Sequence, residues 1–238
     1  MRERQALIFG VNGGLGRALA DTLSSDYAVT GVVRDALAFE SDSIQTLIES
    51  DYSEESLSFV ANTMKTQGHS YDLIINAIGI LHGNHLQPEK RLQDISTDSL
   101  TRYFAINTII PGLLLKYFSS LMPKNTPAVF ASLSAKVGSI GDNRLGGWYG
   151  YRASKAALNM LVRTAAIEIG RTHKQAAVVA IHPGTTVSNL SRPFTANTPA
   201  DKLYTPELSA QRIVSVLTGL TADDTGQFFD WSGDVLPW

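Results

Sequence analysis

Short, almost continuously apolar runs alternate with longer segments of helical period along the whole chain. The runs are predicted strands, and the segments between them are predicted amphipathic helices. Strands that alternate with helices imply right-handed βαβ units and a parallel sheet that is covered on both faces. We therefore predict an α/β fold, a three-layer αβα doubly wound parallel sheet of the Rossmann type, in a single domain over residues 1–238. The predicted strands are residues 6–9, 27–33, 71–75, 128–133 and 176–181, and the predicted helices are residues 15–23, 54–64, 97–121, 149–169 and 206–217.

Composition excludes several classes of function. The 20 Lys and Arg residues against 22 Asp and Glu residues leave the chain nearly neutral, which argues against a nucleic-acid partner. The absence of Cys excludes a disulfide framework, thiolate zinc sites and iron–sulfur ligation. Residues 1–5 carry no signal-peptide pattern, and no apolar run approaches the roughly 20 residues of a membrane span. We expect a cytoplasmic protein with no membrane partner.

A glycine cluster follows the first predicted strand directly and precedes a predicted helix. Its spacing is G-x-x-x-G-x-G, formed by Gly10, Gly14 and Gly16. Backbone N–H groups at such a helix start can hold a pyrophosphate, provided that no side chain blocks its approach. The alternative is a tight turn without a ligand, but the position between strand and helix favours nucleotide binding. The residues expected to contact the cofactor in this loop are Gly10, Asn12, Gly13, Gly14, Leu15 and Gly16.

The end of the second predicted strand indicates which dinucleotide is bound. A carboxylate at this point binds the ribose 2′-OH of NAD, whereas a basic residue accepts the 2′-phosphate of NADP. Val33 occupies the acidic position and Arg34 follows it, which favours NADP over NAD. The neighbouring Asp35 weakens this interpretation, and Arg34 alone is also compatible with an ordinary solvated charge.

Two further strand ends supply candidate cofactor contacts. Asp51 and Tyr52 lie just past a short third strand, where they can accept a hydrogen bond from the adenine amine. Asn76 ends the strand at residues 71–75, and it either contacts the cofactor or only stabilises the turn. The small residues Ala77 and Gly79 after it would let the backbone approach a cofactor.

Tyr151 and Lys155 are four residues apart on a predicted helix, so that they share one helix face. A free phenol has a pKa near 10, which is too high for acid–base work at neutral pH. A fixed Lys charge together with an oxidised nicotinamide would stabilise the phenolate and lower that pKa. The pair alone proves nothing, since a surface i,i+4 contact has the same spacing. The interpretation of the Tyr151–Lys155 pair as catalytic therefore depends on its combination with the glycine cluster.

These motifs together resemble the classical short-chain dehydrogenase/reductases, in order and over essentially the whole chain. Asn107 and Pro183-Gly184 also match this family. Within the family, residues 138–152 and the terminal aromatic segment are similar to the C-factor-like carbonyl reductases. The resemblance implies an NADP-dependent oxidoreductase that transfers a hydride between nicotinamide and a carbonyl or alcohol substrate. It implies that Tyr151 is the acid–base group and that Lys155 binds the ribose and tunes Tyr151.

The resemblance also implies roles for other residues and for the assembly. Asn107 would hold a water in the proton relay, and Pro183 and Gly184 would border the nicotinamide. In the predicted substrate loop, residues 183–204, the hydroxyls of Thr186 and Ser188 would bind the nicotinamide amide. A homodimer or homotetramer would form through the two long helices at residues 97–121 and 149–170.

One departure from the family pattern concerns the catalytic serine. The family places it in a Ser-Ser pair after the fifth strand, and counting back from Gly138 puts that second Ser on Ala135. Either Ser134 serves instead, or Ser139 substitutes, or Tyr151 alone holds the carbonyl; we take Ser134 as the candidate. Loss of one such donor typically costs 10²–10³ in rate.

Particular residues also suggest two interpretations other than a reductase. The first is a cofactor-binding regulatory or cell-signalling protein of the same fold with weak or no catalysis, which Ala135 favours. The second is a metal site at His82 and His85, which lacks a third ligand, so we predict no metal.

Overall fold

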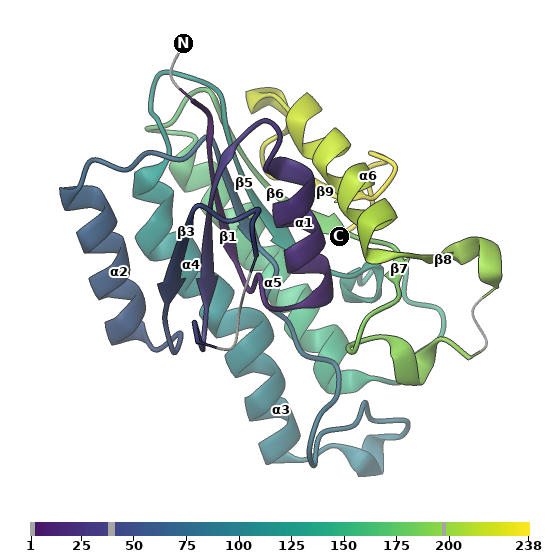
Figure 1. Ribbon diagram of the computed structural model, residues 1–238. Coiled ribbons are helices and arrows are strands. Elements are labelled where there is room, and N and C mark those ends of the chain that lie inside the picture. The colour runs from purple at the N-terminus through teal and green to yellow at the C-terminus, as the bar shows by residue number, and fades with distance from the viewer. Residues whose placement is uncertain (1–2, 38–40, 197–198) are drawn as a thin grey trace.

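A parallel sheet of seven strands forms the centre of the protein in a computed structural model that describes residues 3–37, 41–196 and 199–238 (Figure 1). The strand order is β3-β2-β1-β4-β5-β6-β9, so the order reverses between β1 and β4. The predicted doubly wound parallel sheet is therefore confirmed. The strands are β1 (Gln5–Phe9), β2 (Ala28–Val33), β3 (Thr46–Glu49), β4 (Leu73–Asn76), β5 (Ala128–Leu133), β6 (Ala176–His182) and β9 (Phe228–Asp230).

Helices cover both faces of the sheet, as the near-continuous apolar strands require. One apolar layer joins the sheet to α1 (Gly14–Leu23) and α6 (Pro206–Gly219). The other layer joins it to α2 (Glu54–Thr66), α4 (Ile110–Phe118) and α5 (Tyr149–Ile169). Figure 1 shows α1 and α6 side by side on one face. The three-layer prediction is thus confirmed, with helix ends within two residues of those expected except in the segment 97–121.

The segment 97–121 is not the single continuous helix that its periodicity predicts. It consists of α3 (Thr97–Phe104), a π-helical turn (Ala105–Ile109), α4 and a short 3₁₀ turn (Ser119–Leu121). The cause is Pro111, which has no N–H to donate to the carbonyl of Asn107 four residues earlier and whose ring crowds that carbonyl. The extra residue of the π turn accommodates this crowding, and such turns are frequent at functional sites.

The same stretch, Thr97–Leu121, is long and apolar enough to count as a candidate membrane span by length and composition alone. One face of it is packed inside the protein, because Tyr103, Leu114 and Phe118 are fully buried. This burial is typical of a core helix.

The predicted substrate loop leaves the carboxyl end of β6 and contains structure of its own. Its two short strands, β7 (Thr185–Thr186) and β8 (Leu203–Tyr204), pair in parallel and close the segment on itself. Residues 197–198 of the predicted loop lie outside the described residues.

Candidate active site

Two adjoining cavities run along the carboxyl edge of the sheet. The larger has a volume of about 900 Å³ and the smaller about 450 Å³. They form one elongated cleft because they share five lining residues: Asn12, Gly13, Ala77, Ile78 and Gly79. The cleft lies where the strand order reverses, which is the expected ligand position in open α/β sheets. Its length along several strand ends fits a dinucleotide better than a single small molecule.

The cleft collects nearly all residues that the sequence singled out. The larger cavity is lined by Asn12, Gly13, Gly14, Leu15, Gly16, Ala77, Gly79, Ser134, Tyr151, Lys155, Pro183, Gly184, Thr186 and Ser188. The smaller cavity is lined by Gly10, Asn12, Gly13, Arg34, Asp51, Tyr52, Ala77 and Gly79. Asn76 and Asn107 are not among the lining residues of either cavity.

Each glycine of the first loop has its own steric reason. Gly10 has a φ of +82°, which lets the chain turn sharply after β1. A Cβ on Gly16 would lie 2.3 Å from the carbonyl oxygen of Gly10, so α1 can pack here only without a side chain. A Cβ on Gly14 would meet only Ser188, at 4.0 Å. Packing therefore does not require Gly14, and its lack of a side chain leaves the cleft open.

The start of α1 suits an anion. Its N-cap, Gly13, offers no side-chain hydrogen bond, and the first turn holds no acidic residue. The N–H groups and the positive end of the helix dipole are left for a ligand. The cradle, which any side chain at Gly14 would fill, therefore fits the pyrophosphate of a dinucleotide cofactor.

At the end of β2, Arg34 and Asp35 behave differently. Arg34 lines the smaller cavity. Asp35 is not one of its lining residues, and its carboxylate accepts a hydrogen bond from the backbone N–H of Leu37 over 3.1 Å. The carboxylate is thus used in a local turn, which removes the ambiguity that Asp35 created for the cofactor prediction.

Asp51 and Tyr52 face the cavity in different ways. Asp51 is exposed, and hydrogen bonds from the side chain and then the backbone N–H of Ser53 lower the pKa of its carboxyl. Tyr52 has a left-handed backbone, with φ of +63°, and its buried hydroxyl donates to the carbonyl of Val32. Burial raises the pKa of Tyr52 to about 12. The Tyr52 hydroxyl therefore holds β2, and Asp51 places a carboxylate in the lining of the smaller cavity.

The contacts of Asn76 include one bond within the turn after β4, while its Nδ2 is buried without a hydrogen-bond partner. Its side chain is fully buried, and Oδ1 accepts from the N–H of Ile78 over 3.0 Å. Asn76 therefore stabilises the turn after β4. The turn places Gly79 beside two expected catalytic side chains, because a Cβ on Gly79 would lie 3.5 Å from both Asn107 Oδ1 and Lys155 Nζ.

Tyr151 and Lys155 lie on the first turns of α5, and both line the larger cavity. Lys155 is 4% exposed and its Nζ donates to the carbonyl of Leu133 over 2.9 Å. Burial lowers the pKa of Lys155 to about 8 and raises that of Tyr151 well above its ordinary value. The protein alone therefore keeps the Tyr151 phenol protonated, ready to donate.

Asn107 is fixed by the π turn rather than exposed to the cavity. Its Oδ1 accepts from the N–H of Ile80, and its Nδ2 donates to the carbonyl of Ile80 and to Ser154 Oγ. These three bonds use the whole side-chain amide to join the loop after β4 to α5. Pro111, four residues later, has no N–H to donate to the main-chain carbonyl of Asn107.

The candidate replacements for the missing serine are both engaged elsewhere. Ser134 Oγ donates to Asn159 Oδ1 over 2.6 Å, although the residue lines the cleft. Ser139 Oγ donates to the carbonyl of Trp238 and accepts from the N–H of Asp142, and the residue is not part of the cleft lining. Ala135, in contrast, packs in one apolar cluster with Tyr151. The residue beside the phenol thus offers no donor.

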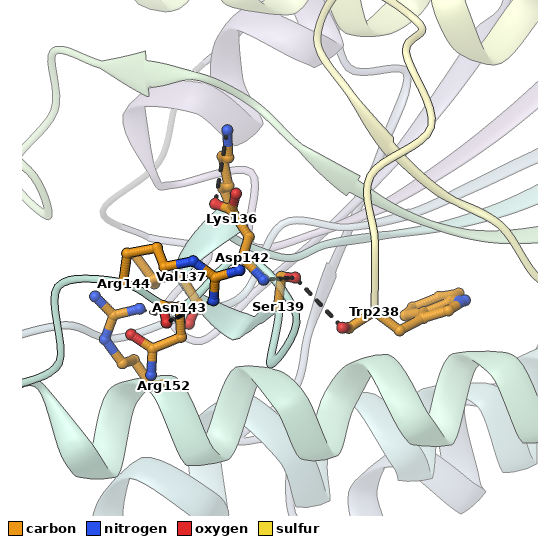
Figure 2. Close-up of polar contacts among 8 residues, drawn as sticks. All are labelled: Lys136, Val137, Ser139, Asp142, Asn143, Arg144, Arg152 and Trp238. Atoms are coloured by element: carbon orange, nitrogen blue, oxygen red, sulfur yellow. Dashed lines mark hydrogen bonds and ion pairs between the residues drawn. The ribbon is translucent and has the colours of Figure 1, made fainter.

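Several charged side chains also line the larger cavity, and Figure 2 shows how they lie around Ser139: Lys136, Asp142, Arg144 and Arg152. Lys136 and Asp142 form an ion pair over 3.6 Å. Arg152 donates to the carbonyls of Val137 and Gly147, which braces the segment before α5. The hydrogen bond from Ser139 to the carbonyl of Trp238 connects the segment between β5 and α5 to the carboxyl-terminal residue, as Figure 2 shows.

The loop after β6 is ordered by its own small residues and by aromatic packing. Gly184 has a φ of +77°, and a Cβ there would lie 2.8 Å from Trp231 and 2.9 Å from Tyr204. The hydroxyl of Thr186 bonds to Ser209 Oγ over 2.7 Å, and that of Ser188 to Ser191 Oγ over 3.3 Å. These hydroxyls lie at the cleft while tied to the loop and α6.

Sequence reasoning missed an aromatic wall opposite the glycine loop. Trp148 contacts both Tyr151 and Phe194, with ring centroids 6.2 and 5.2 Å apart. Phe194 also contacts His82, whose Nε2 bonds to the carbonyl of Asn189 over 2.8 Å. His82 thus binds the loop after β6 through both contacts. Over the described residues, no group of three or more His, Asp or Glu side chains is arranged to hold a metal ion.

A dinucleotide cradle, a Tyr–Lys pair and an apolar cavity on one doubly wound sheet define a nicotinamide-dependent oxidoreductase. A family model described as enoyl-(acyl carrier protein) reductase matches residues 11–217. The chain belongs to the short-chain dehydrogenase/reductase family, which confirms the resemblance of its motifs.

Curated relatives have related names. A 1-hydroxy-2-glutathionyl-2-methyl-3-butene dehydrogenase of Rhodococcus sp. (strain AD45) is 28% identical over 187 residues, 78% of this chain and 76% of that protein. The C-signal protein of Myxococcus xanthus is 32% identical over 150 residues, 62% of this chain and 83% of that protein. An NADPH-dependent pterin aldehyde reductase of Arabidopsis thaliana is 28% identical over 232 residues, 94% of this chain and 91% of that protein.

The fold is also found among solved structures. The carbonyl reductase Sniffer of D. melanogaster superposes with a TM-score of 0.84 at 22% identity, over 100% of both chains. At this level of identity the likeness establishes the fold. It agrees with the sheet order and layers described above.

Proposed function

We propose that the protein reduces the carbonyl group of a small molecule to an alcohol with NADPH. The observation that carries this proposal is the meeting of Tyr151 and Lys155 with the glycine loop in one cleft. Family membership supplies the reaction class, and the pterin aldehyde reductase relative supports the choice of NADPH and of a carbonyl substrate.

The two halves of the cofactor would occupy different cavities: the adenosine half the smaller one and the nicotinamide half the larger one. The loop from Gly10 to Gly16 would hold the pyrophosphate, and Arg34 would pair with the 2′-phosphate at the smaller cavity. Asp51 lies at the adenine end, and Pro183, Thr186 and Ser188 lie at the nicotinamide end. When bound, the nicotinamide supplies the hydride.

The proton comes from Tyr151. Its phenol is buried and protonated, so that it can donate a hydrogen bond to the carbonyl oxygen and then transfer its proton. Lys155, whose pKa is lowered to about 8, lies one helical turn away and stabilises the phenolate that remains. Water near the Asn107 carbonyl and Lys155 Nζ would return the proton.

The substrate cavity favours an apolar body next to the reacting carbonyl. Besides charged side chains, its lining contains a set of aliphatic and aromatic side chains. The apolar lining consists of Ile80, Leu81, Val137, Leu145, Trp148, Leu190 and Phe194. We therefore propose aryl or alkyl ketones and aldehydes as the substrate class.

The test is consumption of NADPH with a panel of such carbonyl compounds, using wild-type protein and Y151F in parallel. We expect turnover by the wild type, and a loss of about 10²–10⁴-fold in Y151F at unchanged NADPH affinity. Turnover in Y151F equal to that of the wild type would refute the role of Tyr151. Failure of NADPH to bind the wild type would refute the proposed function.

A second candidate is a cofactor-binding regulatory or cell-signalling protein with weak catalysis. Two observations favour it: Ala135 leaves the phenol without a neighbouring donor, and one relative is the C-signal protein of Myxococcus xanthus. The two candidates separate in one assay, because a regulator would bind NADPH, seen as a shift in Tm, without oxidising it in the presence of any carbonyl compound of the panel.

We also propose that copies of the chain associate through the helical segments at residues 97–121 and 149–170. Four apolar side chains of this region are exposed by 37–66%: Ile109, Met160, Leu161 and Ile167. Light scattering after gel filtration would give the mass of the assembly, and M160K should reduce it to that of one chain.

A further inference from the structure

A carboxylate lies buried at the start of the catalytic helix, and the mechanism above does not use it. Glu89, in the loop after β4, is 3% exposed. Its Oε2 accepts from the N–H of Gly150 over 3.0 Å, while Oε1 is buried without a hydrogen-bond partner. Burial of a carboxylate is costly unless something stabilises its charge, so this placement requires a reason.

The reason is the amino-terminal end of α5, which lacks a cap of its own. Trp148, the N-cap residue, has a left-handed backbone with φ of +54°, its side chain does not cap the helix, and the first turn holds no acidic residue. Glu89 supplies two of the missing acceptors, because its main-chain carbonyl accepts from the N–H of Trp148 and its carboxylate accepts from the N–H of Gly150. The helix dipole in turn stabilises the buried charge.

Packing makes this contact unusually close. A Cβ on Gly150 would lie 2.8 Å from Glu89 Oε1 and 2.5 Å from Cδ2 of Tyr103. The Tyr103 hydroxyl donates to the carbonyl of Leu81, and its ring lies against that of Tyr151 at a centroid distance of 6.2 Å. The proton donor Tyr151 follows Gly150 directly in the chain. Its position is therefore set by the close packing among Glu89, Gly150 and Tyr103.

The caps of other helices show what is particular to Glu89. Ser53, Ser96 and Thr205 cap α2, α3 and α6 from the adjoining residue in the usual way. Glu89 caps α5 from 61 residues away in the chain, out of a loop that also borders the substrate cavity. A cap of this kind fixes the start of the helix relative to the cavity, not only its helical conformation.

We propose that Glu89 is a positioning residue for Tyr151: its buried carboxylate caps α5 from outside and sets the place of the phenol in the substrate cavity. The inference rests on the proposed function, in which Tyr151 donates the proton. A misplacement of about 1 Å can lower a rate by roughly 10²-fold. Cofactor binding, which depends on the glycine loop and Arg34, does not depend on this contact.

The test compares E89A with S96A, which removes an ordinary helix cap. We expect kcat of E89A to fall about 10- to 100-fold with the Kd for NADPH within about twofold of wild type. Hydrogen exchange should accelerate in the first turn of α5, residues 149–152, and not in the rest of that helix. S96A should lose a comparable amount of Tm and keep its kcat.

Two conservative variants of Glu89 distinguish the effect of its side-chain length from the effect of its charge. E89Q keeps an amide oxygen at the same distance to accept from Gly150, and we expect it to regain most of the turnover that E89A loses. E89D keeps the charge but is one methylene too short, and it should resemble E89A. If E89A is too unstable to purify, the comparison of E89Q with E89D tests the proposal by itself. A higher turnover in E89D than in E89Q would overturn the proposal.

Two further outcomes would also overturn it. One is a kcat of E89A that equals that of S96A, and the other is a parallel loss of NADPH affinity and turnover, which would indicate general damage. A wild type without carbonyl reduction, together with faster exchange confined to residues 149–152 in E89A, would refute the proposed function and leave the cap established. The two failures are therefore distinguishable.

Discussion

Ser134 donates its hydroxyl hydrogen to Oδ1 of Asn159 over a distance of 2.6 Å, and both side chains are at least 96% buried. The bond joins the residue after β5 to α5, one turn beyond Lys155. A hydroxyl that is already committed to a buried amide is poorly placed to bind a substrate oxygen. We therefore predict that Ser134 supports the scaffold and that Tyr151 alone binds the carbonyl, which is one of the three possibilities that the sequence leaves open.

S134A should consequently lose stability and keep its turnover. Removal of the donor leaves Asn159 Oδ1 buried and unpaired, which costs about 1–3 kcal/mol of unfolding free energy. Urea unfolding and steady-state kinetics would measure the two effects. S132A is the matched control, because the Ser132 hydroxyl is buried without a partner, and its loss should be nearly neutral. A hundredfold drop in kcat of S134A would restore the catalytic assignment.

A135S should raise turnover. Ala135 packs with Tyr151, so that a hydroxyl there would add a donor beside the carbonyl oxygen. One such donor is worth about 10²–10³ in rate when fully aligned, and we expect a gain of about tenfold or more in kcat. A135C has a similar volume and a much weaker donor, so it should give little gain. An unchanged kcat in A135S would place the substrate oxygen elsewhere.

R34A should lose the preference for NADPH. Arg34 lines the cavity in which the adenosine end would lie, and a hydrogen bond to a charged group is worth about 1.5–3 kcal/mol. We expect the Kd for NADPH to rise roughly 10- to 100-fold and that for NADH to change little. Titration of both cofactors, with K65A as a remote control, measures this. Equal weakening of both would mean that Arg34 does not distinguish them.

The fold could be predicted from local patterns because each strand of the sheet is buried on both faces and each covering helix has one apolar side. The bounds of β5 and α5 agree with the prediction residue for residue. The failure in the segment 97–121 has a local cause. Periodicity reports which positions are apolar, and it does not register that Pro111 removes one backbone donor and displaces the helix by one residue.

The candidate site was predictable where a residue type and a short spacing define the chemistry, as for the glycine loop and the Tyr151–Lys155 pair. It was not predictable where the contact joins distant segments. Nothing in the sequence around Glu89 indicates that it caps a helix 61 residues later, and nothing near Ser134 identifies Asn159 as its acceptor. The two consecutive glycines before Trp148 were the one local signal of its left-handed backbone.

His182, at the end of β6, should make the protein less stable in mild acid. Burial lowers the pKa of its imidazole to about 4, and its Nδ1 is buried without a partner. The folded protein therefore keeps His182 neutral down to about pH 4, whereas the unfolded chain takes up a proton below its ordinary pKa near 6.5. Because the unfolded state binds more protons in this window, the free energy of unfolding falls as the pH is lowered from 6.5 to 4.

H182N should remove this part of the pH dependence. We expect the difference between wild type and H182N to shrink by about 1–3 kcal/mol between pH 6.5 and pH 4, as measured by urea unfolding across that range. H69N, which changes an exposed histidine, is the control and should follow the wild-type curve. Parallel curves for wild type and H182N would show that His182 takes up its proton equally in the folded and unfolded states.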